Sequence, residues 1–180
     1  MSTAYRFAFY CLCLIVAGGG GYLLREHARA DSSPSTLVGQ ARPDFSLKDF
    51  RGESRRISEW SGKVLLLNFW ATWCPPCKKE IPDLIALQED YKKVGLQIVG
   101  IAIDELGTTQ EFANQAGINY PTLTGEAEAI HVALSYGNTS GALPYTVIVD
   151  RNKRIAFTRP GQVRRDEIEN LIRRLLRIPA

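Results

Sequence analysis

Residues 68–82 read Asn-Phe-Trp-Ala-Thr-Trp-Cys-Pro-Pro-Cys-Lys-Lys-Glu-Ile-Pro, and this segment marks the point where a strand gives way to a helix. Residues 64–70 form a nearly continuous apolar run, which predicts a buried central strand. Apolar positions in 81–91 fall largely on one face, as in an amphipathic helix. Gly95 is expected to end this helix, and Pro82 predicts a kink inside it.

The Cys-x-x-Cys motif in this segment predicts redox chemistry. Cys74 falls at the N-terminus of the helix, where unpaired N–H groups and the helix dipole stabilise a thiolate, the nucleophile of disulfide exchange. Pro75 and Pro76 suit the first helical turn, where a missing N–H costs little. Cys77 lies one turn deeper on the same side, from which it can attack a mixed disulfide at Cys74. The alternatives are a pair of buried structural cysteines or half of a zinc site, but a zinc site needs a second Cys or His pair, which the domain does not offer.

The rest of the chain predicts an α/β domain. A strand, a helix and a second strand in succession imply parallel strands with a right-handed crossover, and a closing hairpin adds antiparallel strands. The sequence therefore predicts an α/β sandwich with a mixed sheet. A helix capped by Thr108 or Thr109 should end at Gly117. The other expected elements are a hairpin of 45–47 with 55–57, strands 96–103, 145–149 and 154–158, and helices 127–136 and 164–177.

The N-terminus carries a targeting signal. Residues 7–24 contain no charge and are just long enough to span a bilayer. Ala28-Arg29-Ala30 has the form of a signal-peptidase site, so a cleaved signal peptide stays open beside the uncleaved anchor that the length of the run favours. We therefore expect a membrane anchor or signal segment at 1–30, a polar linker at 31–38 and a single domain at 39–180.

Composition excludes several classes of function. The formal net charge of the chain is +3, and 19 basic and 18 acidic residues remain outside 1–30. Such a balanced domain lacks the basic footprint of nucleic-acid binding, so no nucleic-acid partner is expected. The two histidines, His27 and His131, are far apart in sequence. We therefore expect neither a metal site nor a Ser-His-Asp site.

Residues 68–82 closely resemble the active-site stretch of the TlpA/ResA-like thioredoxins, a thiol:disulfide oxidoreductase family related to CcmG/DsbE. The resemblance extends over roughly 39–178 and includes the segments 39–45, 100–104 and 143–146. It implies a thioredoxin-like three-layer sandwich with a mixed central sheet and an N-terminal β-hairpin extension. It also implies a location on the periplasmic side of the bacterial inner membrane, and no cofactor beyond the redox-active disulfide of the two cysteines.

The resemblance also implies roles for individual residues. The Leu143–Pro144 peptide bond should be cis and face the cysteine pair, whereas the residues alone would favour a trans proline that begins a strand. Asn68 stands where cytosolic thioredoxins carry a buried, proton-transferring Asp, and Asn cannot titrate. Glu80 is then the candidate for moving the proton of Cys77, with Glu105 as a second candidate. Substrate-binding or supporting positions are Trp73, Pro75, Pro76, Glu80, Leu143 and Pro144.

Several functions fit this site. The resemblance implies a disulfide reductase that passes electrons from a membrane thiol donor of the DsbD/CcdA type to an oxidised protein, for example an apocytochrome c. An oxidase or isomerase on the same fold is the first alternative, because couples of this type span about −270 to −120 mV. A copper-binding thiol chaperone is the second, although the domain has no Met. A peroxiredoxin-like peroxidase is disfavoured, because Ala71 stands where Thr or Ser is expected.

Overall fold

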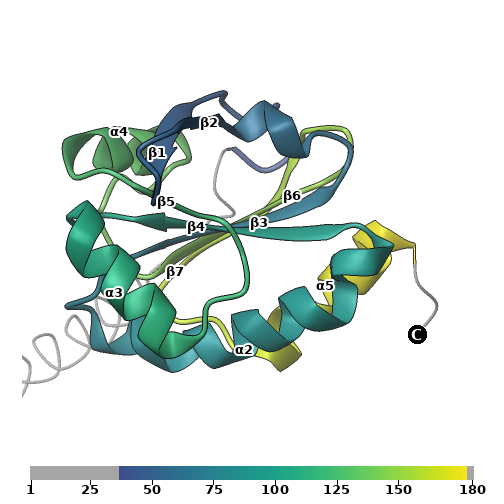
Figure 1. The fold of residues 1–180 in the computed structure, drawn as a ribbon. Coiled ribbons are helices and arrows are strands. Elements are labelled where there is room, and N and C mark those ends of the chain that lie inside the picture. The colour runs from purple at the N-terminus through teal and green to yellow at the C-terminus, as the bar shows by residue number, and fades with distance from the viewer. Residues whose placement is uncertain (1–36, 178–180) are drawn as a thin grey trace, which may run out of the picture. The chain divides into compact units, whose positions relative to one another are not determined.

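The computed structural model describes residues 37–177 (Figure 1). These residues belong to the second of two units into which the chain divides, 34–180. The predicted anchor or signal segment and most of the predicted linker lie outside the described residues. Within 37–177, no helix is both long enough and apolar enough to cross a bilayer.

The described residues form a seven-stranded sheet with the order β2-β1-β5-β4-β3-β6-β7. The central strand β3 runs parallel to β4 and antiparallel to β6, so the predicted mixed sheet is confirmed. The strands are β1 Ser46–Asp49, β2 Ser54–Arg56, β3 Val64–Trp70, β4 Leu96–Ala102, β5 Thr122–Thr124, β6 Tyr145–Val149 and β7 Ile155–Pro160. Apart from β5, each strand agrees with its predicted range to within about two residues.

Helices cover both faces of the sheet and complete a three-layer sandwich (Figure 1). On one face lie α2, α3 and α5, and on the other lies α4, beside the β1–β2 edge of the sheet. The helix α2 continues through Pro82 without interruption. The bounds are α2 Pro75–Tyr91, α3 Leu106–Ala116, α4 Ala127–Ser135 and α5 Arg165–Leu176, with short 3-10 turns η1 Ile57–Trp60 and η2 Lys92–Val94.

The start of α3 differs from the prediction. The helix begins at Leu106, and its N-cap residue is Glu105, not Thr108 or Thr109. Thr109 is buried within the first turn, where its hydroxyl donates to the carbonyl of Glu105 at 2.7 Å. The predicted cap is therefore wrong, because a threonine hydroxyl can bond a carbonyl four residues earlier as readily as it can cap a helix.

The strand β5 was not predicted, and it connects the hairpin to the rest of the sheet. It pairs in parallel with β4 and antiparallel with β1, so the β1–β2 hairpin extends the central sheet at one edge. Three residues with two threonines are too short to show the alternation that identifies a strand. All three are buried between neighbours, and tertiary packing decides their conformation.

Every residue of β3 is buried, and successive side chains point to opposite faces. Leu65, Leu67 and Phe69 belong to the core beneath α4 and the hairpin. Val64 and Leu66 pack with α2 and α5 on the other face. The same alternation places Asn68 and Trp70 on the α2 face, beside the helix that carries the two cysteines.

Candidate active site

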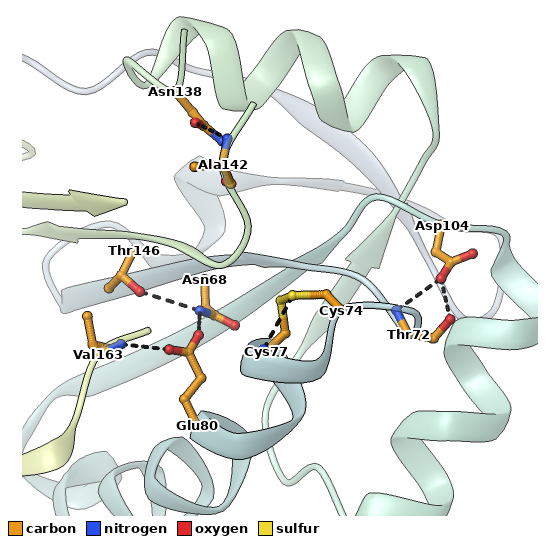
Figure 2. Close-up of a disulfide and its surroundings, with 10 residues drawn as sticks. All are labelled: Asn68, Thr72, Cys74, Cys77, Glu80, Asp104, Asn138, Ala142, Thr146 and Val163. Atoms are coloured by element: carbon orange, nitrogen blue, oxygen red, sulfur yellow. Dashed lines mark hydrogen bonds between the residues drawn. A yellow bond between two sulfur atoms is a disulfide. The ribbon is translucent and has the colours of Figure 1, made fainter. Parts of the chain in front are cut away.

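Cys74 and Cys77 form a disulfide at the start of α2 (Figure 2). Cys74 is the N-cap residue, and the N–H of Cys77 donates to its sulfur at 3.3 Å. The side chains are nearly closed to solvent, with Cys74 3% exposed and Cys77 0% exposed. The predicted position of the pair is therefore confirmed, and Cys74 is the cysteine that a partner can reach more easily.

The disulfide lies in a small apolar cluster with an exposed rim. Its buried neighbours are Trp70, Ala71, Ile81 and Ala102. Trp73 is 66% exposed beside Cys74, Pro75 is exposed and Pro76 is half-buried. Leu143, from a segment distant in sequence, packs against the same cluster. An incoming polypeptide would therefore meet apolar surface around the reactive sulfur.

The Leu143–Pro144 peptide bond is cis, as the resemblance implies. The carbonyl of Pro144 accepts a hydrogen bond from the N–H of Gly161 at 2.8 Å. Just before it, Asn138 braces the loop: its Nδ2 donates to the Ala142 carbonyl at 2.9 Å and its Oδ1 accepts from the Ala142 N–H at 3.0 Å (Figure 2). Asn138 was not among the predicted site residues, although an Asn beside Gly137 is a turn signal.

A second pair of hydrogen bonds holds the loop that leads into the cysteines. The N–H and the hydroxyl of Thr72 both donate to Oδ2 of Asp104, at the end of β4 (Figure 2). No local sequence pattern predicts this contact, because the two residues lie 32 positions apart. Glu105, the second candidate for proton transfer, is exposed, and its N–H donates to the Oδ1 of Asp104.

Glu80 lies at the centre of a buried hydrogen-bond network one turn beyond Cys77. Its side chain is fully buried. Asn68 Nδ2 donates to Oε1 of Glu80 at 2.6 Å, and the N–H of Val163 donates to Oε2 at 2.8 Å. Asn68 Nδ2 also donates to the Thr146 hydroxyl at 3.4 Å (Figure 2). Of the two glutamates proposed from sequence, Glu80 is the one that the structure holds in this network.

Burial raises the pKa of Glu80 from its ordinary value of 4.5 to about 7. The hydrogen bonds from Val163 and Asn68 oppose this rise, because they stabilise the carboxylate, and the charge of Asp83 adds to it. A carboxyl group with a pKa near neutrality exchanges protons with little cost in either direction, which suits it to general acid–base chemistry.

The raised pKa of Glu80 makes the folding stability depend on pH. The folded protein binds this proton more tightly than the unfolded chain, so the stabilising contribution is complete below pH 4.5 and is lost as pH rises through about 7. On the order of 3 kcal/mol of unfolding free energy is at stake. We expect the free energy of unfolding of the disulfide form, measured with urea, to decline between about pH 5 and pH 8, and we expect Glu80→Gln to remove most of this decline. Equal slopes in the two proteins would contradict the assignment.

The described residues hold no group of three or more His, Cys, Asp or Glu side chains placed to share a metal ion.

The chain is similar to known thiol-disulfide oxidoreductases. The model of the AhpC/TSA family matches residues 38–158. The thiol-disulfide oxidoreductase ResA of Geobacillus kaustophilus is 30% identical over 88% of each chain, and ResA of Bacillus thuringiensis is 28% identical over 91% of this chain and 92% of its own. A solved thioredoxin-family thiol:disulfide interchange protein from Chlorobium tepidum has a TM-score of 0.67 and 27% identity, over 82% of this chain and 99% of that one. The chain therefore belongs to the AhpC/TSA family and, within it, to the ResA-like thiol-disulfide oxidoreductases with a thioredoxin-like fold.

Proposed function

We propose that the protein is a protein-disulfide reductase that works outside the cytoplasm. The observation that carries this proposal is the carboxyl group of Glu80, buried one turn from Cys77. Negative charge on Glu80 disfavours the thiolate of the reduced pair and so destabilises that pair relative to the disulfide, which carries no charge. A pair that gains stability on oxidation donates electrons to its partner.

The reaction has two steps. The Cys74 thiolate attacks a disulfide of the partner, the partner's S–S bond breaks and a mixed disulfide forms at Cys74. Glu80 then takes the proton of Cys77, and the Cys77 thiolate attacks the sulfur of Cys74. The Cys74–Cys77 disulfide forms, the mixed disulfide breaks, and the partner leaves as a dithiol that has gained two electrons.

The rim of the site supports a polypeptide substrate. Trp73 presents a large exposed ring, and Leu143 packs beside the pair, so apolar surface surrounds Cys74. By resemblance, the oxidised partner is an apoprotein such as apocytochrome c, and a membrane thiol donor of the DsbD/CcdA type restores the dithiol. The charge-free run 7–24 supports tethering of the domain to the periplasmic side of the inner membrane.

The reduction potential of the pair tests the direction of electron flow. The measurement uses full-length protein in detergent, with Cys11 and Cys13 replaced by Ser, equilibrated with glutathione buffers. We expect the Cys74–Cys77 pair to have a reduction potential at or below roughly −200 mV. In Glu80→Gln the potential should rise, because loss of the negative charge stabilises the reduced form. A value near about −120 mV, typical of strong oxidants, would make the protein a disulfide donor.

A further inference from the structure

Three buried polar atoms lie on the α2 face of the sheet without a hydrogen-bond partner among the described residues. They are the indole Nε1 of Trp70, the hydroxyl of Tyr120 and the hydroxyl of Thr122. Their side chains are 0%, 6% and 4% exposed. An unpaired buried polar group is costly, and native proteins commonly satisfy such groups with ordered water.

The three side chains converge on Gly100 of β4. A Cβ at Gly100 would lie 3.1 Å from both Trp70 Nε1 and Thr122 Oγ1, and 3.4 Å from Cε2 of the Tyr120 ring. The lack of a side chain at Gly100 therefore leaves a small polar space bordered by the indole N–H of Trp70, the Thr122 hydroxyl and the edge of the Tyr120 ring. One N–H donor and two hydroxyl groups without partners are what a buried water molecule needs, since it makes about three hydrogen bonds.

This polar space adjoins the Glu80 network. Asn68 is directly opposite Gly100 in the β3–β4 pairing. Its Nδ2 donates to Glu80, and its Oδ1 is a further buried atom without a partner among the described residues. Burial and then the charge of Glu80 raise the pKa of the Tyr120 hydroxyl.

Two of the three residues, Tyr120 and Thr122, also line a cavity at the protein surface. A cavity of about 390 Å³ opens between the β1–β2 turn and the end of α3, and Tyr120, Pro121 and Thr122 line it. Neither cysteine lines this cavity, nor does Leu143. A path to bulk water through this cavity would not pass over the reactive disulfide.

We propose that Trp70, Tyr120 and Thr122 hold a buried water molecule through which Glu80 exchanges protons with this cavity. The inference rests on the role of Glu80 in the proposed function and adds Tyr120 and Thr122 as positioning residues. The route matters in the second step, when the mixed disulfide and the bound partner cover Cys74.

The step balances without a further reactant. The S–H proton of Cys77 moves to the Glu80 carboxylate as the Cys77 sulfur bonds to that of Cys74. The bond between Cys74 and the partner breaks, and the partner's sulfur leaves as a thiolate with the electron pair. Glu80 then passes its proton through the water molecule to the cavity, and the departing thiolate takes up a proton in solution.

An aromatic disulfide that releases a coloured thiolate in each half-reaction separates the two steps. We expect one equivalent, mixed with reduced full-length protein bearing Ser at positions 11 and 13, to give a fast phase from Cys74 and a second phase from Cys77. Thr122→Val, close in shape but without a hydroxyl, should slow only the second phase, by about tenfold or more. Tyr120→Phe should do the same, and Thr122→Ser, which keeps the hydroxyl, should retain the parent rate.

The controls distinguish this inference from the proposed function. Urea unfolding of each variant checks that it is folded. If Thr122→Val forms the Cys74–Cys77 disulfide at the parent rate while Glu80→Gln forms it slowly, the water route is wrong and the role of Glu80 stands. If Thr122→Ser is as slow as Thr122→Val, packing and not the hydroxyl is responsible, and the route is again wrong. If Glu80→Gln also forms the Cys74–Cys77 disulfide at the parent rate, both the water route and the role of Glu80 are wrong.

Discussion

Cys74→Ser is expected to reduce a protein disulfide such as that of insulin no faster than the uncatalysed background. The hydroxyl of Ser is a far weaker nucleophile than a thiolate, and the N-cap position that stabilises an anion at residue 74 then has none to stabilise. Cys77→Ser should fail differently. It keeps the attacking sulfur of Cys74 but cannot release the partner, so a mixed disulfide at Cys74 should accumulate.

Mass spectrometry under non-reducing conditions measures this difference directly. Cys77→Ser mixed with an oxidised substrate should shift by the mass of one substrate molecule, and the shift should vanish on reduction. The double variant Cys11→Ser, Cys13→Ser is the matched control, because it removes the two cysteines outside the motif and should keep the parent rate. A parent rate in Cys74→Ser would remove the first step of the proposed mechanism.

The fold was predictable where a periodic pattern is long enough. The seven apolar or buried positions of β3 and the helical spacing of apolar residues in α5 are local patterns, and both elements were predicted to within about one residue. The short strand β5 carries no such signal, since it exists because β4 and β1 offer it hydrogen bonds from both sides. The start of α3 shows the same limit, because the Thr109 hydroxyl can either cap a helix or bond a carbonyl one turn earlier, and the sequence alone does not distinguish the two.

The candidate site was predictable in its covalent part and not in its supports. The Cys-x-x-Cys spacing and the position of Glu80 one turn later are local, so the sequence places them together. The N–H of Val163 comes from 83 residues away, which no spacing rule anticipates. Asn68 was read as the loss of a titrating group, whereas the structure shows it as a donor to Glu80. An Asp at position 68 would place a second carboxylate beside that of Glu80, and the two would repel each other. The amide of Asn68 avoids this repulsion and donates a hydrogen bond to Glu80 instead.

Glu80→Gln is expected to slow the second half-reaction by about 10²-fold at neutral pH and to leave the first unchanged, since Gln cannot accept the Cys77 proton. In the parent protein, the rate of this step should rise with pH through about 7, as the Glu80 carboxyl group ionises and becomes a base. In the variant the rate should rise only at higher pH, where Cys77 loses its proton without the help of Glu80. The two-phase reaction with an aromatic disulfide, recorded between about pH 5 and pH 9, measures both profiles.

Glu105→Gln provides the matched control for this prediction. Glu105 is exposed at the N-cap of α3, and the same change of charge there should leave both phases and both pH profiles as in the parent. If Glu105→Gln instead flattened the profile of the second phase and Glu80→Gln did not, the base would be the exposed residue. The buried carboxyl group would then serve only to join α2 to β3 and Val163 through its hydrogen bonds. The pH profile decides between these roles, because a purely structural glutamate changes the amplitude or the stability and does not move the midpoint at which the closing step accelerates.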